Sequence, residues 1–205
     1  MATPNEKLAE SLTKLQVLQR SGRQVLRSAD LTRTHLTRLT NNGYLKPILK
    51  GWYMSARPDE LDGDTATWFA SVRDFIRGYC DERFGEDWYV NPELSLLLHT
   101  GSTSLPRQIQ IHALLGHNNS LSLPAGMSLF DYRAKDFAAS SSRTVAQGLR
   151  VLSLEAAILR ATPNMWQSDT LTFRLSLEQL RDVSQLSRLL LDGDHSVIAG
   201  RLAGG

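Results

Sequence analysis

A short polar helix followed by a hairpin constrains the N-terminal part of this chain most strongly. Between Arg33 and Gly43 the apolar residues Leu36 and Leu39 recur at helical spacing, while most other side chains are polar. Gly43 is typical of a helix end, because glycine adopts a left-handed backbone at little cost. Two strand-like runs then flank Lys50-Gly51, which predicts a β-hairpin over 44–54.

The segments before this helix complete a recognisable order of elements. An apolar stripe predicts a helix over 5–20, with Asn5 as its N-cap and Gly22 as its terminator; its members are Leu8, Leu12, Leu15 and Leu18. Val25-Leu26 suits a short strand, and Ser28 suits the N-cap of a short helix over 28–31. Helix, strand, short helix, polar helix and hairpin in this order predict a winged helix-turn-helix domain over residues 1–57.

Charge is divided unevenly along the chain. Residues 1–57 contain ten Lys and Arg and three acids, a net charge of +7, although the whole chain carries only +2. The remainder has 13 of the 23 basic and 18 of the 21 acidic residues, a net charge of −5. Such asymmetry indicates a polyanion-binding module joined to a part that does not bind polyanions.

The outward side chains of the polar helix are hydrogen-bonding types that suit base edges and phosphates. The candidate DNA contacts on it are Arg33, Thr34, His35, Thr37, Arg38 and Asn41, and those of the hairpin are Lys46 and Lys50. The alternative is a small helical domain whose basic residues form a solvated face. We expect Trp52 and Tyr53 to belong to the hairpin core.

The rest of the chain, 58–205, predicts a mixed α/β domain after a polar linker at 55–64, and an α+β class for the whole protein. Expected helices lie at 65–84, 92–99, 154–161 and 175–191. Expected strands lie at 88–90, 108–114, 128–131 and 149–154. The strand at 108–114 is best defined, because Ile109, Ile111 and Ala113 alternate with polar residues.

This second part has few signs of catalysis. Phosphate-binding loops, metalloprotease motifs, nucleophile elbows and paired cysteines do not occur in the sequence. Its densest titratable cluster, Asp192-Gly-Asp-His195, could hold a magnesium ion, but a helix end with solvated acids explains it equally well. We therefore expect neither enzymatic activity nor a cofactor or metal site.

Cellular location follows from what the chain lacks. Cys80 is its single cysteine, which excludes an internal disulfide and favours a reducing compartment. The sequence contains neither a signal-peptide pattern nor a long apolar run. We expect a cytoplasmic protein that does not associate with membranes.

Several segments together resemble AbiEi-family antitoxins of type IV toxin-antitoxin systems. In the first part these are Val25-Leu-Arg-Ser-Ala-Asp-Leu31, Asn42-Gly-Tyr-Leu45 and Lys50-Gly-Trp-Tyr53, where lysine replaces the arginine usual in the family. The similarity continues through Ser95–Gly101, Pro106-Arg107, Gly126–Asp131 and Leu149–Ala157. It implies a bacterial autorepressor that binds double-stranded DNA at the promoter of its own operon, with a second domain that opposes a cognate toxin.

Two other functions remain open from the sequence. The chain also resembles the AbiEi-like region that precedes a Fic domain in some bacterial proteins, although the Fic signature is absent here. This implies a regulatory protein-interaction module that inhibits or positions a fused or neighbouring Fic-type enzyme. A nuclease using Asp192 and Asp194 as metal ligands is the third possibility, and no second cluster of ligands accompanies them.

Overall fold

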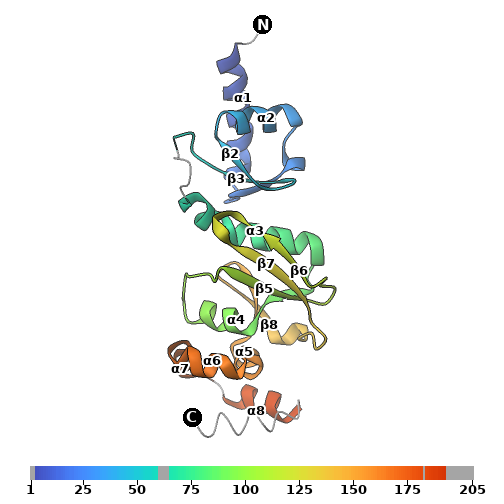
Figure 1. Ribbon diagram of the computed structural model, residues 1–205, viewed down its shortest axis with the longest axis vertical. Helices are drawn as coiled ribbons and strands as arrows, with labels where there is room; N and C mark the ends of the chain where they lie inside the picture. Colours follow the sequence, from blue (N-terminus) through green and yellow to red (C-terminus); the bar gives the residue numbers. More distant parts are fainter. Residues whose placement is uncertain (1–2, 60–64, 182, 193–205) are drawn as a thin grey trace. The chain divides into compact units, whose positions relative to one another are not determined.

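The computed structural model describes residues 3–59, 65–181 and 183–192 of the chain, and the helices and strands form an α+β protein (Figure 1). Its contacts divide the chain into two compact units. The first comprises Met1–Glu82 with Ser122–Gly126, and the second comprises Arg83–Leu121 with Met127–Gly205. Among the described residues, the helices are all too short or too polar to cross a membrane.

The first unit contains the elements that the sequence predicts for residues 1–57, in the predicted order. They are α1 (Pro4–Gln19), β1 (Val25–Arg27), η1 (Ser28–Asp30), α2 (Arg33–Asn41), β2 (Leu45–Leu49) and β3 (Trp52–Ser55). The strands form an antiparallel sheet in the order β1-β3-β2. Gly51, in the turn between β2 and β3, has φ of +84°, a backbone conformation that favours glycine.

Two helix caps differ from the predicted ones. Thr3, rather than Asn5, caps α1: its side chain accepts from the Glu6 backbone N–H, and Glu6 accepts in return from the Thr3 N–H. This capping box satisfies two donors at once, and Pro4 can then start the helix. The short helix η1 follows Arg27, whose backbone N–H donates to Asp30 at 2.7 Å.

Leucines from α1, β1, α2 and β2 form the core on one side of this sheet. Its buried members are Leu15, Leu26, Leu31, Leu39 and Leu45. Leu39 is fully buried, whereas Leu36 is only partly buried at the same core. Tyr53 of β3 packs against this cluster, so one face of the sheet is covered by α1 and α2.

The other face of the sheet packs against α3 (Ala66–Phe84). Trp52, the neighbour of Tyr53 along β3, lies edge-on to Phe75 with ring centroids 5.5 Å apart. A side chain at Gly78 would approach the Trp52 ring to 3.1 Å, which explains why glycine stands there. Contacts thus group α3, up to Glu82, with the first unit, whereas the sequence-based division ends the first domain at residue 57.

The second unit is built on a mixed four-stranded sheet in the order β4-β5-β7-β6. Its strands are β4 (Trp88–Val90), β5 (Gln108–Ala113), β6 (Asn119–Ser122) and β7 (Ser128–Arg133). β4 pairs antiparallel with β5, and β5 pairs parallel with β7. A separate antiparallel hairpin consists of β8 (Arg143–Ala146) and β9 (Leu149–Leu152). Of these, β6 and β8 had no sequence-based prediction.

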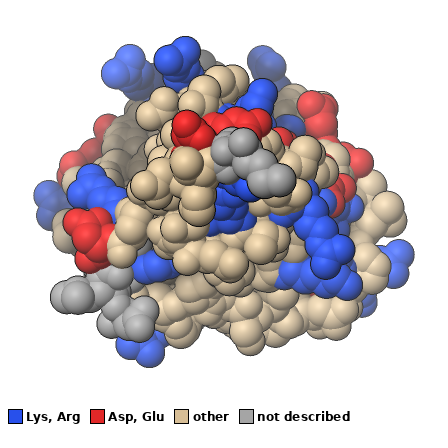
Figure 2. All heavy atoms as spheres, turned by 90° about the horizontal axis from the view of Figure 1, so that it is seen from above, with Lys and Arg blue, Asp and Glu red and all other residues tan. Residues whose placement is uncertain are grey.

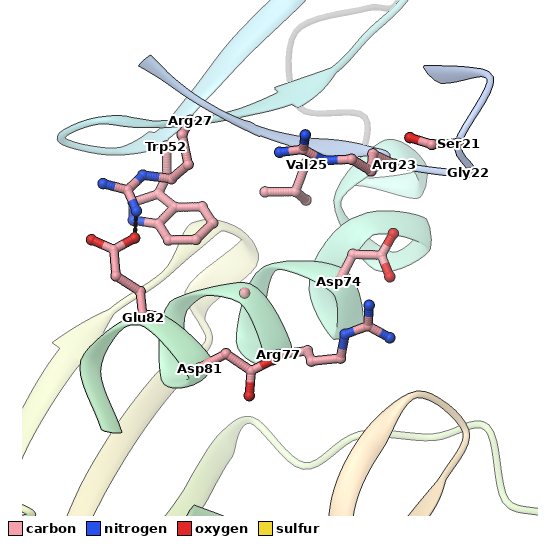
Figure 3. A pocket seen from close by; sticks show the side chains of 11 residues that line it. Ser21, Gly22, Arg23, Val25, Arg27, Trp52, Asp74, Arg77, Asp81 and Glu82 are labelled. Carbon is pink, nitrogen blue, oxygen red and sulfur yellow. Dashed lines mark ion pairs between the residues drawn. The ribbon is translucent and has the colours of Figure 1, made fainter. Parts of the chain in front are cut away.

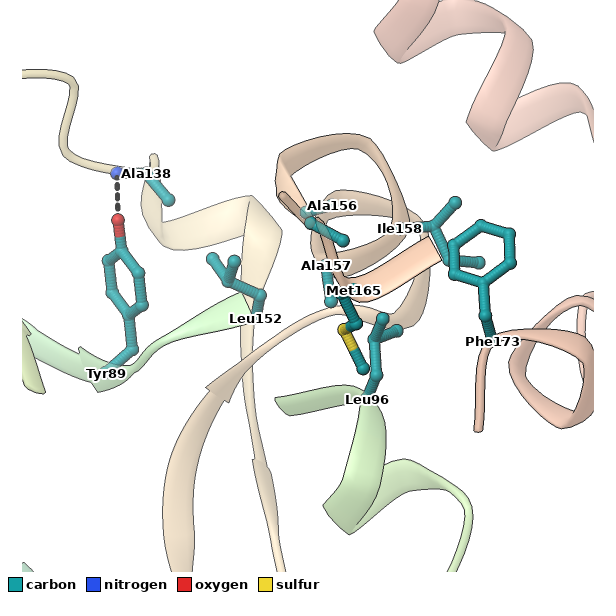
Figure 4. Close-up of a cluster of buried hydrophobic side chains, with 10 residues drawn as sticks. Tyr89, Leu96, Ala138, Leu152, Ala156, Ala157, Ile158, Met165 and Phe173 are labelled. Atoms are coloured by element: carbon teal, nitrogen blue, oxygen red, sulfur yellow. Dashed lines mark hydrogen bonds between the residues drawn. The ribbon is translucent and has the colours of Figure 1, made fainter. Parts of the chain in front are cut away.

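Helices and strands of the second unit contribute side chains to a buried core (Figure 4). The helices of this unit are α4 (Pro92–His99), α5 (Leu154–Arg160), α6 (Pro163–Ser168), α7 (Thr170–Glu178) and α8 (Val183–Asp192). The short 3-10 turn η3 (Ser140–Ser142) belongs to the same unit, whereas η2 (Pro124–Gly126) belongs to the first. The core contains Leu96, Leu152, Ile158 and Phe173. Tyr89 enters it from β4 and accepts a hydrogen bond from the Ala138 N–H at 3.3 Å; burial raises the pKa of its hydroxyl.

The prediction of one long helix over 175–191 is wrong. The described structure has α7, which begins after Asp169, and a separate α8. Asp169 caps α7 by accepting from the Thr172 N–H at 3.2 Å, which moves the helix start five residues earlier than predicted. The chain then turns after Glu178, and Leu180 packs against the core of the second unit.

His112 lies on β5 between two aromatic rings. Ring centroids of Tyr89 and Tyr132 are 5.5 Å and 5.1 Å from it. Burial lowers the pKa of His112 below its ordinary value of 6.5; Glu93 opposes this shift and Arg160 adds to it. The folded protein therefore disfavours protonation of this imidazole.

This shift predicts how stability responds to acid. As pH falls below 6.5, the unfolded chain takes up a proton at His112 before the folded chain does, so the free energy of unfolding decreases. His112→Phe keeps an aromatic ring but cannot titrate, so the variant should lose less stability in this range. Urea unfolding at several pH values between about 7.5 and 5, on either side of the ordinary histidine pKa of about 6.5, gives the free energy of unfolding of both proteins. Parallel curves for both proteins throughout would contradict the prediction.

Candidate nucleic-acid interface

Helix α2 has one apolar and one polar face. It begins after Thr32, whose hydroxyl accepts from the His35 N–H at 3.4 Å, and it ends before Gly43, where φ is +76°. Leu39 inserts into the leucine core of the first unit. Because residues three and four apart share a helix face, the residues opposite Leu39 are left at the surface.

An open hollow of about 530 Å³ follows this polar face of α2. It is lined by Arg33, Thr34, Thr37, Arg38, Asn41 and Asn42. Five of the six candidate residues predicted on α2 therefore share this surface, which we call the α2 hollow. Its lining carries two guanidinium groups and no carboxylate, so its charge is positive. Arginine and asparagine supply the paired donors and acceptors that fit base edges and phosphates.

His35 is the exception among the candidate residues of α2. Its Nδ1 lies 2.9 Å from the Ser11 hydroxyl of α1, and the residue does not line the α2 hollow. Ser11 is fully buried, and its hydroxyl is also 3.0 Å from the Lys7 carbonyl. His35 therefore contacts α1.

Arg38 contacts both α1 and the hollow. Its Nη1 group donates to the Lys7 carbonyl at 2.7 Å and to the Ser11 hydroxyl at 2.8 Å. The same side chain lines the α2 hollow. A guanidinium fixed at one end loses less conformational entropy when its other donors meet a ligand. We call the set of Ser11, His35 and Arg38 the α1–α2 latch.

Sequence reasoning missed Ser11 and Asn42. Ser11 lies three residues after Leu8 and four before Leu15, so it is a polar residue on the apolar stripe of α1. That position was a signal, because a polar side chain on a buried stripe needs a hydrogen-bond partner. Asn42 stands next to Gly43 and suited a turn. Its amide donates to the Arg38 carbonyl at 2.7 Å while it lines the hollow.

The two hairpin lysines differ in exposure. Lys50 is exposed in the turn between β2 and β3, beside Gly51. Lys46 is half-buried on β2, where it pairs with Met54. Neither lysine lines the α2 hollow. Figure 2 shows one face of the molecule, on which Lys and Arg side chains are spread with a few acidic side chains between them.

A second pocket of the first unit lies between β1, β3 and α3, with a volume of about 480 Å³ (Figure 3). Arg27 lies over the Trp52 ring, 4.5 Å from its centroid, and forms an ion pair with Glu82. The charged residues of its lining are Arg23, Arg27, Arg77, Asp74, Asp81 and Glu82. Because the two signs balance, this pocket suits a polyanion less well than the α2 hollow.

Histidines of the second unit have separate surroundings. His99 lies 2.8 Å from the Leu152 carbonyl, and His117 lies beside Arg83 and the buried Asp131. Among the described residues, no group of three or more His, Cys, Asp or Glu side chains could hold a metal ion. Residues 193–195 of the acidic cluster lie outside the described part of the chain.

Comparison with known proteins gives little. No protein-family profile matches the chain, and no curated protein matches it. Among solved structures it is similar to the antibiotic-resistance factor ANT(2'')-Ia, with 16% sequence identity and a TM-score of 0.40. The match covers 68% of this chain and 95% of that chain. A likeness of this strength carries no argument about function.

The α1–α2 latch predicts a cost for Ser11→Ala. The substitution removes the buried hydroxyl that half-buried Arg38 and His35 share, so the free energy of unfolding should fall by about 0.5 to 1.5 kcal/mol. Thr13→Ala is the matched control, because the Thr13 hydroxyl bonds within α1, to the Ala9 carbonyl. Hydrogen exchange of α1 and α2 amides in both variants measures the loss. Equal protection in the two variants would refute a latch.

Proposed function

We propose that the first unit binds double-stranded DNA with the polar face of α2 in the major groove. The observation that carries the proposal is the α2 hollow, where arginine, asparagine and threonine side chains gather on an open surface without a carboxylate. Protein helices enter major grooves, and arginine and asparagine are the side chains best suited to guanine and adenine edges. The helix-strand-helix-helix-hairpin order of the unit favours the same use.

The dimensions of α2 fit this role. Arg33, Thr37 and Asn41 recur every four residues along the hollow. At a rise of about 1.5 Å per residue, the first and last lie about 12 Å apart along the helix. That distance corresponds to three or four base pairs at about 3.4 Å each. One copy of α2 would therefore contact a short half-site.

The hairpin supplies the backbone contact in this proposal. Lys50 is exposed at its turn, and the excess of basic residues over 1–57 favours phosphates generally. Phosphate contacts set the position of a protein on the duplex, while base contacts set the sequence. We assign Lys50 to the first task and the α2 hollow to the second.

The biological role is inferred from the sequence resemblance. AbiEi-like segments in both parts of the chain favour an autorepressor and antitoxin, whose DNA target is the promoter of its own operon. The second unit would then oppose a cognate toxin. Regulation of a Fic-type enzyme remains the alternative, and it predicts no sequence-specific DNA binding.

Fluorescence anisotropy of the purified full chain tests this function. One labelled duplex carries the DNA upstream of its gene, and a second carries the same bases in scrambled order. Autorepression predicts tight binding to the first duplex, weaker binding to the second, and affinity that falls steeply with salt. Failure to bind either duplex at low salt would reject DNA binding and favour a protein partner.

Arg33→Ala should weaken specific binding. Arg33 is exposed, it lines the hollow and it begins α2, where side chains reach base edges. Loss of a bidentate contact should cost about 1 to 3 kcal/mol at one base pair and relax specificity there. Anisotropy on a set of single-base-pair substitutions measures both effects, with Lys14→Ala on the exposed surface of α1 as the control. Equal weakening on every sequence would make Arg33 a phosphate contact.

Lys50→Ala should change the salt dependence instead. Removing one phosphate contact lowers the slope of log affinity against log salt by about one unit and weakens all sequences alike. The same anisotropy titrations at several salt concentrations provide the slope. If it stays at the wild-type value, the hairpin does not touch DNA.

A further inference from the structure

The second unit contains a small pocket whose lining includes two arginines and Glu86, and the proposed DNA interface does not include it. It has a volume of about 200 Å³ and lies between the β8–β9 hairpin, the start of β4 and the turn η3. Two arginines from adjacent strands, Arg143 of β8 and Arg150 of β9, line it together with Trp88. We call it the β8–β9 pocket.

Both guanidinium groups are held by packing in addition to their ion pairs with Asp87 and Glu86. Arg143 donates from Nη1 to the Glu86 backbone carbonyl at 2.6 Å and lies over the Phe137 ring, 4.9 Å from its centroid. Arg150 lies over the buried Trp88 ring at 6.0 Å. Their side chains are 17% and 30% exposed, so most of their length is fixed by packing. Such arginines lose little conformational entropy when they bind a ligand.

The carboxylates that pair with these arginines are exposed to solvent. The Glu86 carboxylate lies 3.7 Å from Arg150 and is 87% exposed, and that of Asp87 lies 3.9 Å from Arg143 and is 54% exposed. Both distances exceed a hydrogen bond, and exposed ion pairs contribute little in water. A stronger anion can therefore displace either carboxylate from its arginine.

Hydroxyl groups complete the lining. Ser140 and Thr144 are exposed residues at the pocket, from η3 and β8. Two guanidinium groups and two hydroxyls offer a concentration of donors that suits the oxygens of a tetrahedral oxyanion. Phosphate fits this set best, because arginine pairs with it through two parallel hydrogen bonds.

We propose that the β8–β9 pocket binds a phosphate group, supplied either by inorganic phosphate or by a nucleoside triphosphate. Arg143 and Arg150 hold the phosphate oxygens, the Ser140 and Thr144 hydroxyls donate to them, and Glu86 is the competing anion at the rim. This binding site is independent of α2 and does not require that the first unit bind DNA.

Equilibrium dialysis of the full chain with radiolabelled inorganic phosphate, and separately with labelled ATP, tests the proposal at constant ionic strength. Binding of phosphate alone assigns the pocket to the free ion. Binding of ATP without binding of phosphate assigns it to the nucleotide. Failure of both ligands to bind overturns the proposal.

Variants with opposite expected effects place any binding in the pocket. Arg143→Gln and Arg150→Gln each remove a charged hydrogen-bond donor, which should weaken binding about tenfold or more. Glu86→Gln removes the competitor and should tighten binding a few-fold, because an exposed pair contributes about 0.2 to 1 kcal/mol. Arg133→Gln, at an exposed arginine on β7, should leave affinity unchanged.

Glu86→Gln tests the pocket in a variant that should fold, because the Glu86 side chain is mostly exposed and its substitution keeps the packing of both arginines. Thermal unfolding of each variant identifies any that fail to fold. Binding that is unchanged in folded Arg143→Gln and Arg150→Gln, or that is not tightened by Glu86→Gln, would overturn the assignment to this pocket.

Discussion

The attachment of α2 to α1 is the constraint on which the proposed DNA interface depends. Leu39 supplies the apolar part of that attachment, and buried Ser11 supplies the polar part through His35 and Arg38. Because His35 and Arg38 of α2 both bond to the same buried hydroxyl of α1, the latch favours one rotational setting of the helix. That setting presents Arg33, Thr37 and Asn41 to the α2 hollow rather than to the core.

The sheet of the first unit also packs against α3, so this unit extends beyond residue 57. β3 alternates, with Tyr53 directed to the leucine core and Trp52 to α3. Gly78 permits close approach of α3, and the Arg27–Glu82 ion pair spans the same contact. The sequence predicts Trp52 in the hairpin core but does not predict its contact with α3.

Local patterns predicted the first unit well, because its elements are short, amphipathic and bounded by glycine. α2, Gly43, the hairpin and most residues of the hollow follow from spacing alone. What depends on distant partners did not follow: His35 bonds to a residue 24 positions away, and β8 is a strand through pairing with β9. The split between α7 and α8 likewise depends on the Asp169 cap and on the packing of Leu180. The β8–β9 pocket combines side chains from separated segments, so no local motif could indicate it.

Amide chemical shifts of the isotope-labelled full chain, recorded during titration with its own upstream duplex, test the central claim most directly. The account predicts that the largest changes occur along α2, at Asn42 and at Lys50-Gly51. It predicts small changes at Asp74 and Arg77, which line the pocket between β1, β3 and α3. Changes concentrated at α3 or in the second unit, with α2 unaffected, would contradict the claim that the polar face of α2 is the DNA interface.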